Sequence, residues 1–437
     1  MRLPWSACVF VAALAGPSAP CWPDPPPPTG DASAGPAGPI PIEPSPPVTG
    51  LARWFNPATA PFIPVPEIAV DPNSGTTLGL IPTWVQTNED HNVSRIIAPD
   101  IIYNPNFGVG VHGRVYEYSS LDEQWSVVAG AKERVEREFN GEYESGRSRQ
   151  ERWSVNYSLV YDRDGTTRFY GIGNATPLSN ETTYVDQQEF AQAQIGLNLN
   201  HTWQLLYTTR YKVVDVLPGA LNDVPSIQTL FPTIYGLGTN KEMLNRLGLV
   251  YDTRDDPIIP SRGMKWVVYG GAAAKNGLLN DSSYSEAGVD GRGFWPLAPD
   301  TELAAHVALH YLPGTGQVPF WALSNIGGGE SEIGGEQPLR GFGAGRYYGR
   351  DSFSTSVELR HKVYTFDAVT TLIDIEVAPF ADLGRVFNRS STSPLDQLHQ
   401  VYGVGFRGIA RPFVVGYVDV GHGSEGAAVF TGLNYPF

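Results

Sequence analysis

The sequence predicts an all-β protein, a 16-stranded antiparallel transmembrane β-barrel with a lumen-plugging loop. Three observations predict it: long segments that alternate apolar and polar residues, aromatic residues near the ends of these segments, and an amino-terminal export signal. Only 17% of the 437 residues are charged, against about 25% in a typical soluble domain. A long helical bundle is excluded by this composition, and a hydrophobic fraction of 41% excludes global disorder.

Residues 1–15 have the organisation of a secretory signal peptide. Arg2 supplies the positive start, residues 7–15 are an unbroken apolar run, and Ala13-Leu14-Ala15 forms an A-x-A cleavage pattern. This run is too short to span a membrane as a helix, and no later stretch offers about 18 consecutive apolar residues. We therefore expect an exported protein that is periplasmic, secreted or a membrane β-barrel.

Residues 16–66 are rich in proline, with four consecutive prolines at 25–28. Such a composition is typical of an extended or disordered spacer, and we expect it to lie in the periplasm. The barrel domain is then expected to occupy residues 67–437.

From about Thr76 the chain alternates with period two. Trp153, Val155 and Tyr157, for example, are separated by Ser154 and Asn156. A soluble β-sandwich alternates as well, but these segments run over about 10 to 17 residues, whereas soluble strands average about five or six. A strand that spans a bilayer needs about 9 to 11 residues, and in hydrocarbon the sheet must close to pair every backbone group.

We place the sixteen strands with starts near residues 76, 94, 107, 123, 147, 182, 201, 243, 262, 283, 300, 352, 370, 400, 413 and 427. An even number puts both termini on the periplasmic side. The last strand is expected to continue to Phe437, with Tyr435 on the same apolar face. Two connections, about 218–242 and about 313–351, are long enough to be functional or disordered loops.

Several classes of function are disfavoured by the residues themselves. A formal net charge of −15 argues against nucleic acid as a partner. His306 and His310 have the spacing of a zinc-binding helix, but the segment alternates as a strand and no glutamate follows His306, so we predict no metal site. No nucleophile elbow and no phosphate-binding loop motif occurs, and we expect no cofactor and no enzymatic activity.

Leu339-Arg340-Gly341-Phe342 lies in the second long connection, and Phe380-Ala381-Asp382-Leu383-Gly384 lies in a later strand. They resemble the (V/I/L)-R-G-(F/Y) loop motif and the F-x-D-x-G strand motif of the BamA/TamA-like outer-membrane superfamily, also called the bacterial surface antigen family. The stretch from Tyr251 to Pro257 resembles its periplasmic turn, and the resemblance spans about 68–437. Members usually carry POTRA domains before the barrel, so the Pro-rich stretch suggests a barrel-only member.

By alternation, Glu358 and Asp382 face the lumen, because carboxylates that face lipid would cost several kcal/mol. The resemblance implies that Arg340 pairs with Asp382 and Glu358 as a structural latch that pins the loop inside the barrel. Gly341 and Gly343 are expected to permit the turn that delivers Arg340. The plainer alternative is that these are ordinary lumen polar residues without pairing.

The resemblance further implies a protein that assists insertion or translocation of protein, or of lipid, at the outer membrane of a Gram-negative bacterium. Its first and last strands would open laterally for an unidentified client. Phe437 and Tyr435 resemble the carboxy-terminal signal by which the outer-membrane assembly machinery recognises such chains. The alternative is a passive channel gated by the Gly-rich loop 313–351, with outer-membrane lipid as its surroundings in either case.

Overall fold

The computed structural model describes residues 63–89, 92–120, 122–314, 316–328, 339–368, 371–388, 393–410, 414–433 and 435–437. The chain divides into two units, 1–48 and 49–437, and every described residue belongs to the second. The predicted signal peptide, the spacer up to residue 62 and the glycines just before Leu339 lie outside the described residues.

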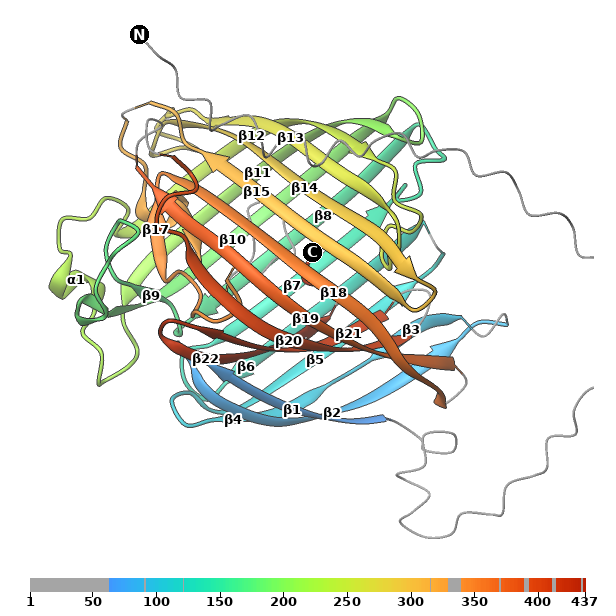
Figure 1. Cartoon of the computed structure of the whole chain (residues 1–437). Coiled ribbons are helices and arrows are strands. Elements are labelled where there is room, and N and C mark those ends of the chain that lie inside the picture. The colour runs from blue at the N-terminus through green and yellow to red at the C-terminus, as the bar shows by residue number, and fades with distance from the viewer. Residues whose placement is uncertain are drawn as a thin grey trace, which may run out of the picture. The chain divides into compact units, whose positions relative to one another are not determined.

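The second unit is one antiparallel sheet that closes into a barrel (Figure 1). Its wall is built, in chain order, from β1 (Ile63–Asp71), β2 (Gly75–Thr87), β3 (Val93–Ile97), β4 (Asp100–Asn104), β5 (Gly108–Tyr118), β6 (Glu123–Lys132), β7 (Arg137–Ser145), β8 (Trp153–Asp164), β10 (Thr182–Asn198), β11 (Trp203–Pro218), β12 (Gly238–Asp252), β13 (Gly263–Ala273), β14 (Tyr284–Ala298), β15 (Thr301–Tyr311), β18 (Asp351–Ala368), β19 (Thr371–Phe387), β20 (His399–Ala410), β21 (Val414–Gly423) and β22 (Gly426–Leu433).

These elements fill eighteen strand positions within the described ranges, because β3 and β4 both pair with β2 and β5 and share one position. The closed antiparallel barrel is confirmed, and the predicted number of sixteen strands is wrong. Two strands were missed. β1 contains Pro64 and Pro66 and so resembled the spacer, and β7 carries too few apolar residues to show a clear outward face.

The wall separates an apolar outer surface from a polar interior. Leu78, Leu159 and Leu247 are 51%, 57% and 68% exposed on the outside, which is the face that lipid would cover. Glu358 and Asp382 are 0% and 2% exposed in the interior. No helix in the described part of the chain is long and apolar enough to cross a membrane.

The barrel closes between its first and last strands, and this seam is weakly paired. Among the residues that the structure describes, β1 pairs with β22 only through Val70 and Val429, whereas β1 forms nine registered pairs with β2 and β22 forms eight with β21.

The carboxy-terminal end corrects a further prediction. β22 ends at Leu433, and Tyr435 and Phe437 lie in the interior, where they are 8% and 5% exposed. The guanidinium of Arg360 lies 3.8 Å from the Tyr435 ring centre, and the Phe437 ring stacks 5.5 Å from His306. The contacts with Arg360 and His306 stabilise the two aromatic rings in the interior, because a cation is attracted to the face of an aromatic ring. A strand end that faces lipid would not supply these contacts.

The remaining short elements lie in connections. Between β8 and β10 are β9 (Arg168–Phe169) and η2 (Leu178–Asn180), and in the two long connections are α1 (Ile227–Leu230), η3 (Phe320–Ala322), β16 (Ser324–Ile326) and β17 (Tyr347–Gly349). β16 and β17 pair with each other as a separate two-stranded sheet within the connection from β15 to β18.

Candidate functional site

The connection between β15 and β18 packs against the inner surface of the barrel. Leu339 and Phe342 are 0% and 1% exposed and share an apolar cluster with Phe380 of β19 and Val401 of β20. This cluster fixes the loop motif against the wall. Arg340, which lies between Leu339 and Phe342 in the sequence, is thereby held at a defined depth in the lumen.

Arg340 reaches the residues that the sequence predicted for it. Its Nε and Nη2 donate to the two Asp382 oxygens at 3.1 and 2.8 Å, and its Nη1 lies 2.5 Å from Glu358 Oε1. The Arg340 backbone N–H also donates to Asp382 at 3.0 Å. Asp382 is thus bound in the two-pronged manner that suits a guanidinium.

Arg340 belongs to a larger buried set, which we call the arginine network. Its members are 0–2% exposed and comprise three arginines and three carboxylates: Arg340, Arg360, Arg407, Glu358, Asp382 and Asp419. Glu358 accepts from all three arginines, at 2.5, 2.8 and 3.1 Å. The formal charges cancel, which is what burial of six ionised groups requires.

Three members of the network and one ring contact were not predicted. Asp419 of β21 lies 2.9 Å from Arg340 Nη1 and also pairs with Arg407. The Phe380 ring faces the Arg340 guanidinium at 3.6 Å. Alternation places Arg360 on the same face as Glu358, a signal that could have revealed it, but sequence alone does not bring β21 next to the loop.

The charge of Arg340 is secured by its surroundings. Burial alone would lower the pKa of Arg340, but the carboxylates of Asp382, Glu358 and Asp419 raise it well above its ordinary value. The guanidinium therefore stays charged beside these carboxylates.

The glycines of the loop act differently from the prediction. The left-handed backbone conformations belong to Leu339 and Gly345, with φ of 63° and 66°, and not to Gly341 or Gly343. A Cβ on Gly341 would lie 2.8 Å from the Gly423 nitrogen, so this glycine is needed for close approach to the wall. In the strand motif, a Cβ on Gly384 would lie 3.1 Å from the Phe353 carbonyl oxygen, a tight contact, and at ordinary contact distance from Leu339.

The two histidines of β15 are buried and paired with carboxylates. His306 Nε2 lies 2.7 Å from Asp290, and His310 Nε2 lies 3.6 Å from Glu286. The described residues contain no group of three or more side chains suited to hold a metal ion.

The turn between β12 and β13 carries the third sequence signal. The Asp255 carboxylate accepts the backbone N–H groups of Ser261 and Arg262 at 2.9 and 3.1 Å, which closes the turn. Burial raises the pKa of Asp255, but the hydrogen bonds from Ser261 and Arg262 outweigh it and keep this pKa low.

With the geometry established, comparison with known proteins identifies the family. A model described as the Omp85 superfamily domain matches residues 122–409. The chain belongs to the Omp85 superfamily. Omp85 barrels are outer-membrane proteins that serve insertion or transport and are not enzymes, which places this protein in the bacterial outer membrane. The matched residues include Arg340, Glu358 and Asp382 and exclude β1, Asp419 and β22.

Solved structures of similar fold are distant in sequence. BamA from Haemophilus ducreyi lacking POTRA domains 1–3 is 11% identical with a TM-score of 0.48, over 85% of this chain and 74% of that one. CdiB from Escherichia coli is 12% identical with a TM-score of 0.49, over 85% and 66%. CdiB from Acinetobacter baumannii is 12% identical with a TM-score of 0.41, over 85% and 59%. No curated protein matches the sequence.

Proposed function

We propose that this Omp85 barrel assists the insertion or translocation of protein, or of lipid, at the outer membrane by opening between β1 and β22. The observation that carries this proposal is the single registered pair, Val70 with Val429, at the seam. The other β1 residues in the described range have no registered partner in β22, and backbone groups without a strand partner are a template for strand addition.

The energetics favour opening at this seam. A backbone hydrogen bond contributes about 0.5–1.5 kcal/mol net, so separation costs scale with the length of the pairing. The seam holds one registered pair, against nine between β1 and β2 and eight between β21 and β22. The barrel should therefore part between β1 and β22 before any neighbouring strands separate.

We propose that Arg340, Asp382 and Glu358 act as the structural latch. The contacted carboxylates belong to β18, β19 and β21, and the Ala344 carbonyl of the same loop accepts a hydrogen bond from Asn73 in the β1–β2 turn at 2.8 Å, so the loop contacts both sides of the seam. A latch of this kind would hold the loop to β18, β19 and β21 while opening of the seam breaks the hydrogen bond between Asn73 and Ala344.

The experiment is a disulfide across the seam, Val70→Cys with Val429→Cys, in a Cys21→Ser background. A matched control, Ala193→Cys with Thr209→Cys, bridges a registered pair of β10 and β11. Quantitative outer-membrane proteomics and lipid analysis on a deletion strain complemented with each version should show loss of a client only when the seam is locked. Normal clients and lipids with an oxidised seam disulfide would refute lateral opening.

The second candidate function is a passive channel gated by the loop 313–351. It is supported by the buried positions of Leu339 and Phe342 against the inner wall, since removal of a loop so placed would widen the lumen. An unchanged proteome and lipid profile in the deletion strain, with altered uptake of small solutes, would favour the channel over the client-handling function.

We also propose that Tyr435 and Phe437 serve as the assembly signal before they fold inward. Their burial in the finished barrel means that the assembly machinery could bind them only on the unfolded chain. Phe437→Ala should slow assembly in cells more than spontaneous refolding into lipid vesicles, and equal slowing in both would reject recognition by the machinery.

A further inference from the structure

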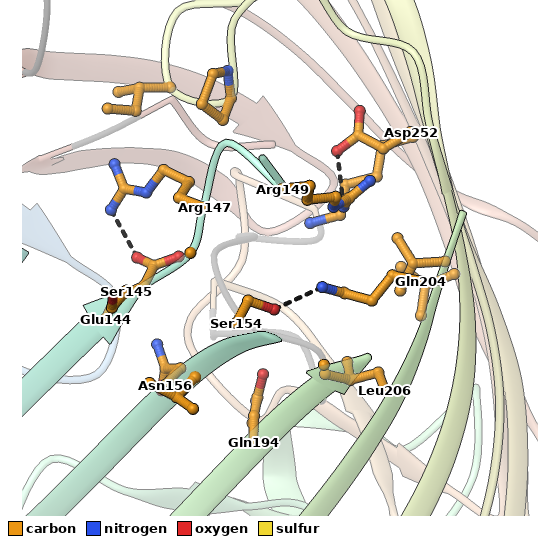
Figure 2. A pocket seen from close by; sticks show the side chains of 18 of the residues that line it. Glu144, Ser145, Arg147, Arg149, Ser154, Asn156, Gln194, Gln204, Leu206 and Asp252 are labelled. Carbon is orange, nitrogen blue, oxygen red and sulfur yellow. Dashed lines mark hydrogen bonds and ion pairs between the residues drawn. The ribbon is translucent and has the colours of Figure 1, made fainter. Parts of the chain in front are cut away.

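The lumen contains a polar cavity of about 480 Å³ at the end where the carboxy-terminus lies. Tyr435, Phe437 and the turns around Arg149 and Arg254 line it. Figure 2 shows its charged and amide side chains arranged around one opening. Sites for small ligands commonly enclose about 300–1,000 Å³, so the cavity is large enough for an organic ligand and not only for water.

One side of the cavity carries a concentration of positive charge. Asp252 of β12, Lys265 of β13 and Arg292 of β14 are cross-strand neighbours in one row. Arg254 and Arg149 reach in from two turns, and both contact Asp252, at 2.9 and 3.1 Å. These four cations face two carboxylates, Asp252 and Asp290, the second of which pairs with Arg292. The group therefore has a surplus of about two positive charges, although the chain as a whole has a net charge of −15.

Lys265 is the residue of this group that lacks a partner. Its ammonium makes no hydrogen bond and no ion pair with any residue in the described ranges, although it lines the cavity. The charges that act on it are those of Arg254, Arg292, Asp252 and Arg149, of which three repel it. Lys265 and Arg292 lie directly opposite each other on neighbouring strands, where like charges destabilise a sheet, so an anionic ligand would relieve repulsion that Asp252 only partly offsets.

The other side of the cavity offers neutral hydrogen-bonding groups. The Gln194 amide makes no hydrogen bond with another side chain or backbone group among the described residues, and Asn156 donates to Glu142 at 2.8 Å. Both amides face the opening (Figure 2). Amides at such positions suit the hydroxyl groups of a ligand.

We propose that this cavity binds a phosphate ester of a hydroxylated molecule, with the phosphate at Lys265, Arg149 and Arg254 and the hydroxyls toward Gln194 and Asn156. A soluble sugar phosphate and a phosphoglycerol lipid headgroup share this chemistry. The inference stands independently of the function proposed above, because it concerns a site that neither the seam nor the arginine network uses.

The test is isothermal titration calorimetry on the full-length protein in a neutral detergent. The probes are glucose 6-phosphate, glucose and short-chain phosphatidylglycerol. We expect glucose 6-phosphate to bind, glucose not to bind, and Lys265→Gln to weaken binding roughly tenfold or more, because a charge-assisted hydrogen bond is lost. Binding of phosphatidylglycerol alone would assign the site to a lipid headgroup. Failure of both phosphate probes to bind would overturn the proposal.

Arg262→Gln is the matched control, since Arg262 lies in the same turn as Arg254, is 74% exposed and does not line the cavity. It should bind as the wild type does. An equal loss in Lys265→Gln and Arg262→Gln would show unspecific charge attraction and refute the site. If Lys265→Gln does not fold, as judged by heat-modifiable migration in gels, Arg149→Gln makes the same comparison with the same expected loss.

Discussion

The substitution Arg340→Met tests the arginine network most directly. Asp382 receives three hydrogen bonds from Arg340, and its other partner is Ser356 at 2.6 Å. Removal of Arg340 leaves three carboxylates facing two arginines, so one buried negative charge is uncompensated. Breaking a buried pair in this way costs about 3–5 kcal/mol, and we expect the free energy of unfolding to fall by that amount.

The assay is urea-induced unfolding in lipid vesicles, followed by the fluorescence of the protein's 10 tryptophans. Limited proteolysis of the loop should show faster cleavage in the variant, because the loop loses its ionic anchor. Arg340→Lys keeps the charge but not the two-pronged contact and should lie between the wild type and Arg340→Met.

The charge argument has its own control. In Arg340→Met with Asp382→Asn, the number of uncompensated charges returns to zero, and we expect at least about 1 kcal/mol of the loss to be recovered. If Arg340→Met unfolds at the wild-type midpoint with a protected loop, or if the double variant is less stable than the single one, the buried charge balance does not hold the loop.

Three further predictions follow from close contacts in the lumen. Gly341→Ala should cost about 1–3 kcal/mol in urea unfolding because its Cβ would meet the wall, whereas Gly408→Ala, with no atom within 4 Å of an added Cβ, should change little. Asp419→Asn should cost about 1.5–3 kcal/mol through its charged hydrogen bonds, and wild-type stability would contradict its place in the network. Phe437→Ala should lower the free energy of unfolding by about 3 kcal/mol and therefore lower the thermal midpoint, because a buried aromatic ring is removed. An unchanged midpoint would show that the inward tail does not stabilise the barrel.

The sequence predicted the type of barrel but not its size. Alternation is a local property, so segments such as the one from Trp153 to Tyr161 could be assigned to strands from the residues alone. β1 and β7 could not, because prolines in one and polar residues in the other hide the outward face. Their strand conformation follows from pairing with β2 and with β6 and β8, which is tertiary information.

The residues of the arginine network likewise divide into those that the sequence indicated and those that only the structure revealed. Arg340, Asp382 and Glu358 were found from motifs and alternation, because each motif is short and contiguous. Asp419 and Arg407 join the network because β20 pairs with β19 and β21 pairs with β20, and the loop packs against these strands, although Asp419 is 79 positions from Arg340 in the sequence. The roles of Gly341 and Gly343 were misjudged for the same reason, since steric contact with the distant wall and not local backbone conformation requires them.

The sequence by itself therefore determined an outer-membrane β-barrel of the Omp85 type, because periodicity and short motifs are written along the chain, while its export signal and its loop latch stay predictions. Only the tertiary structure decided the eighteen strand positions of the described chain, the single-pair seam at Val70 and Val429, the inward turn of Tyr435 and Phe437, and the cationic cavity around Lys265. Each of these depends on how strands pair and pack in three dimensions, and the seam in addition depends on closure of the whole barrel.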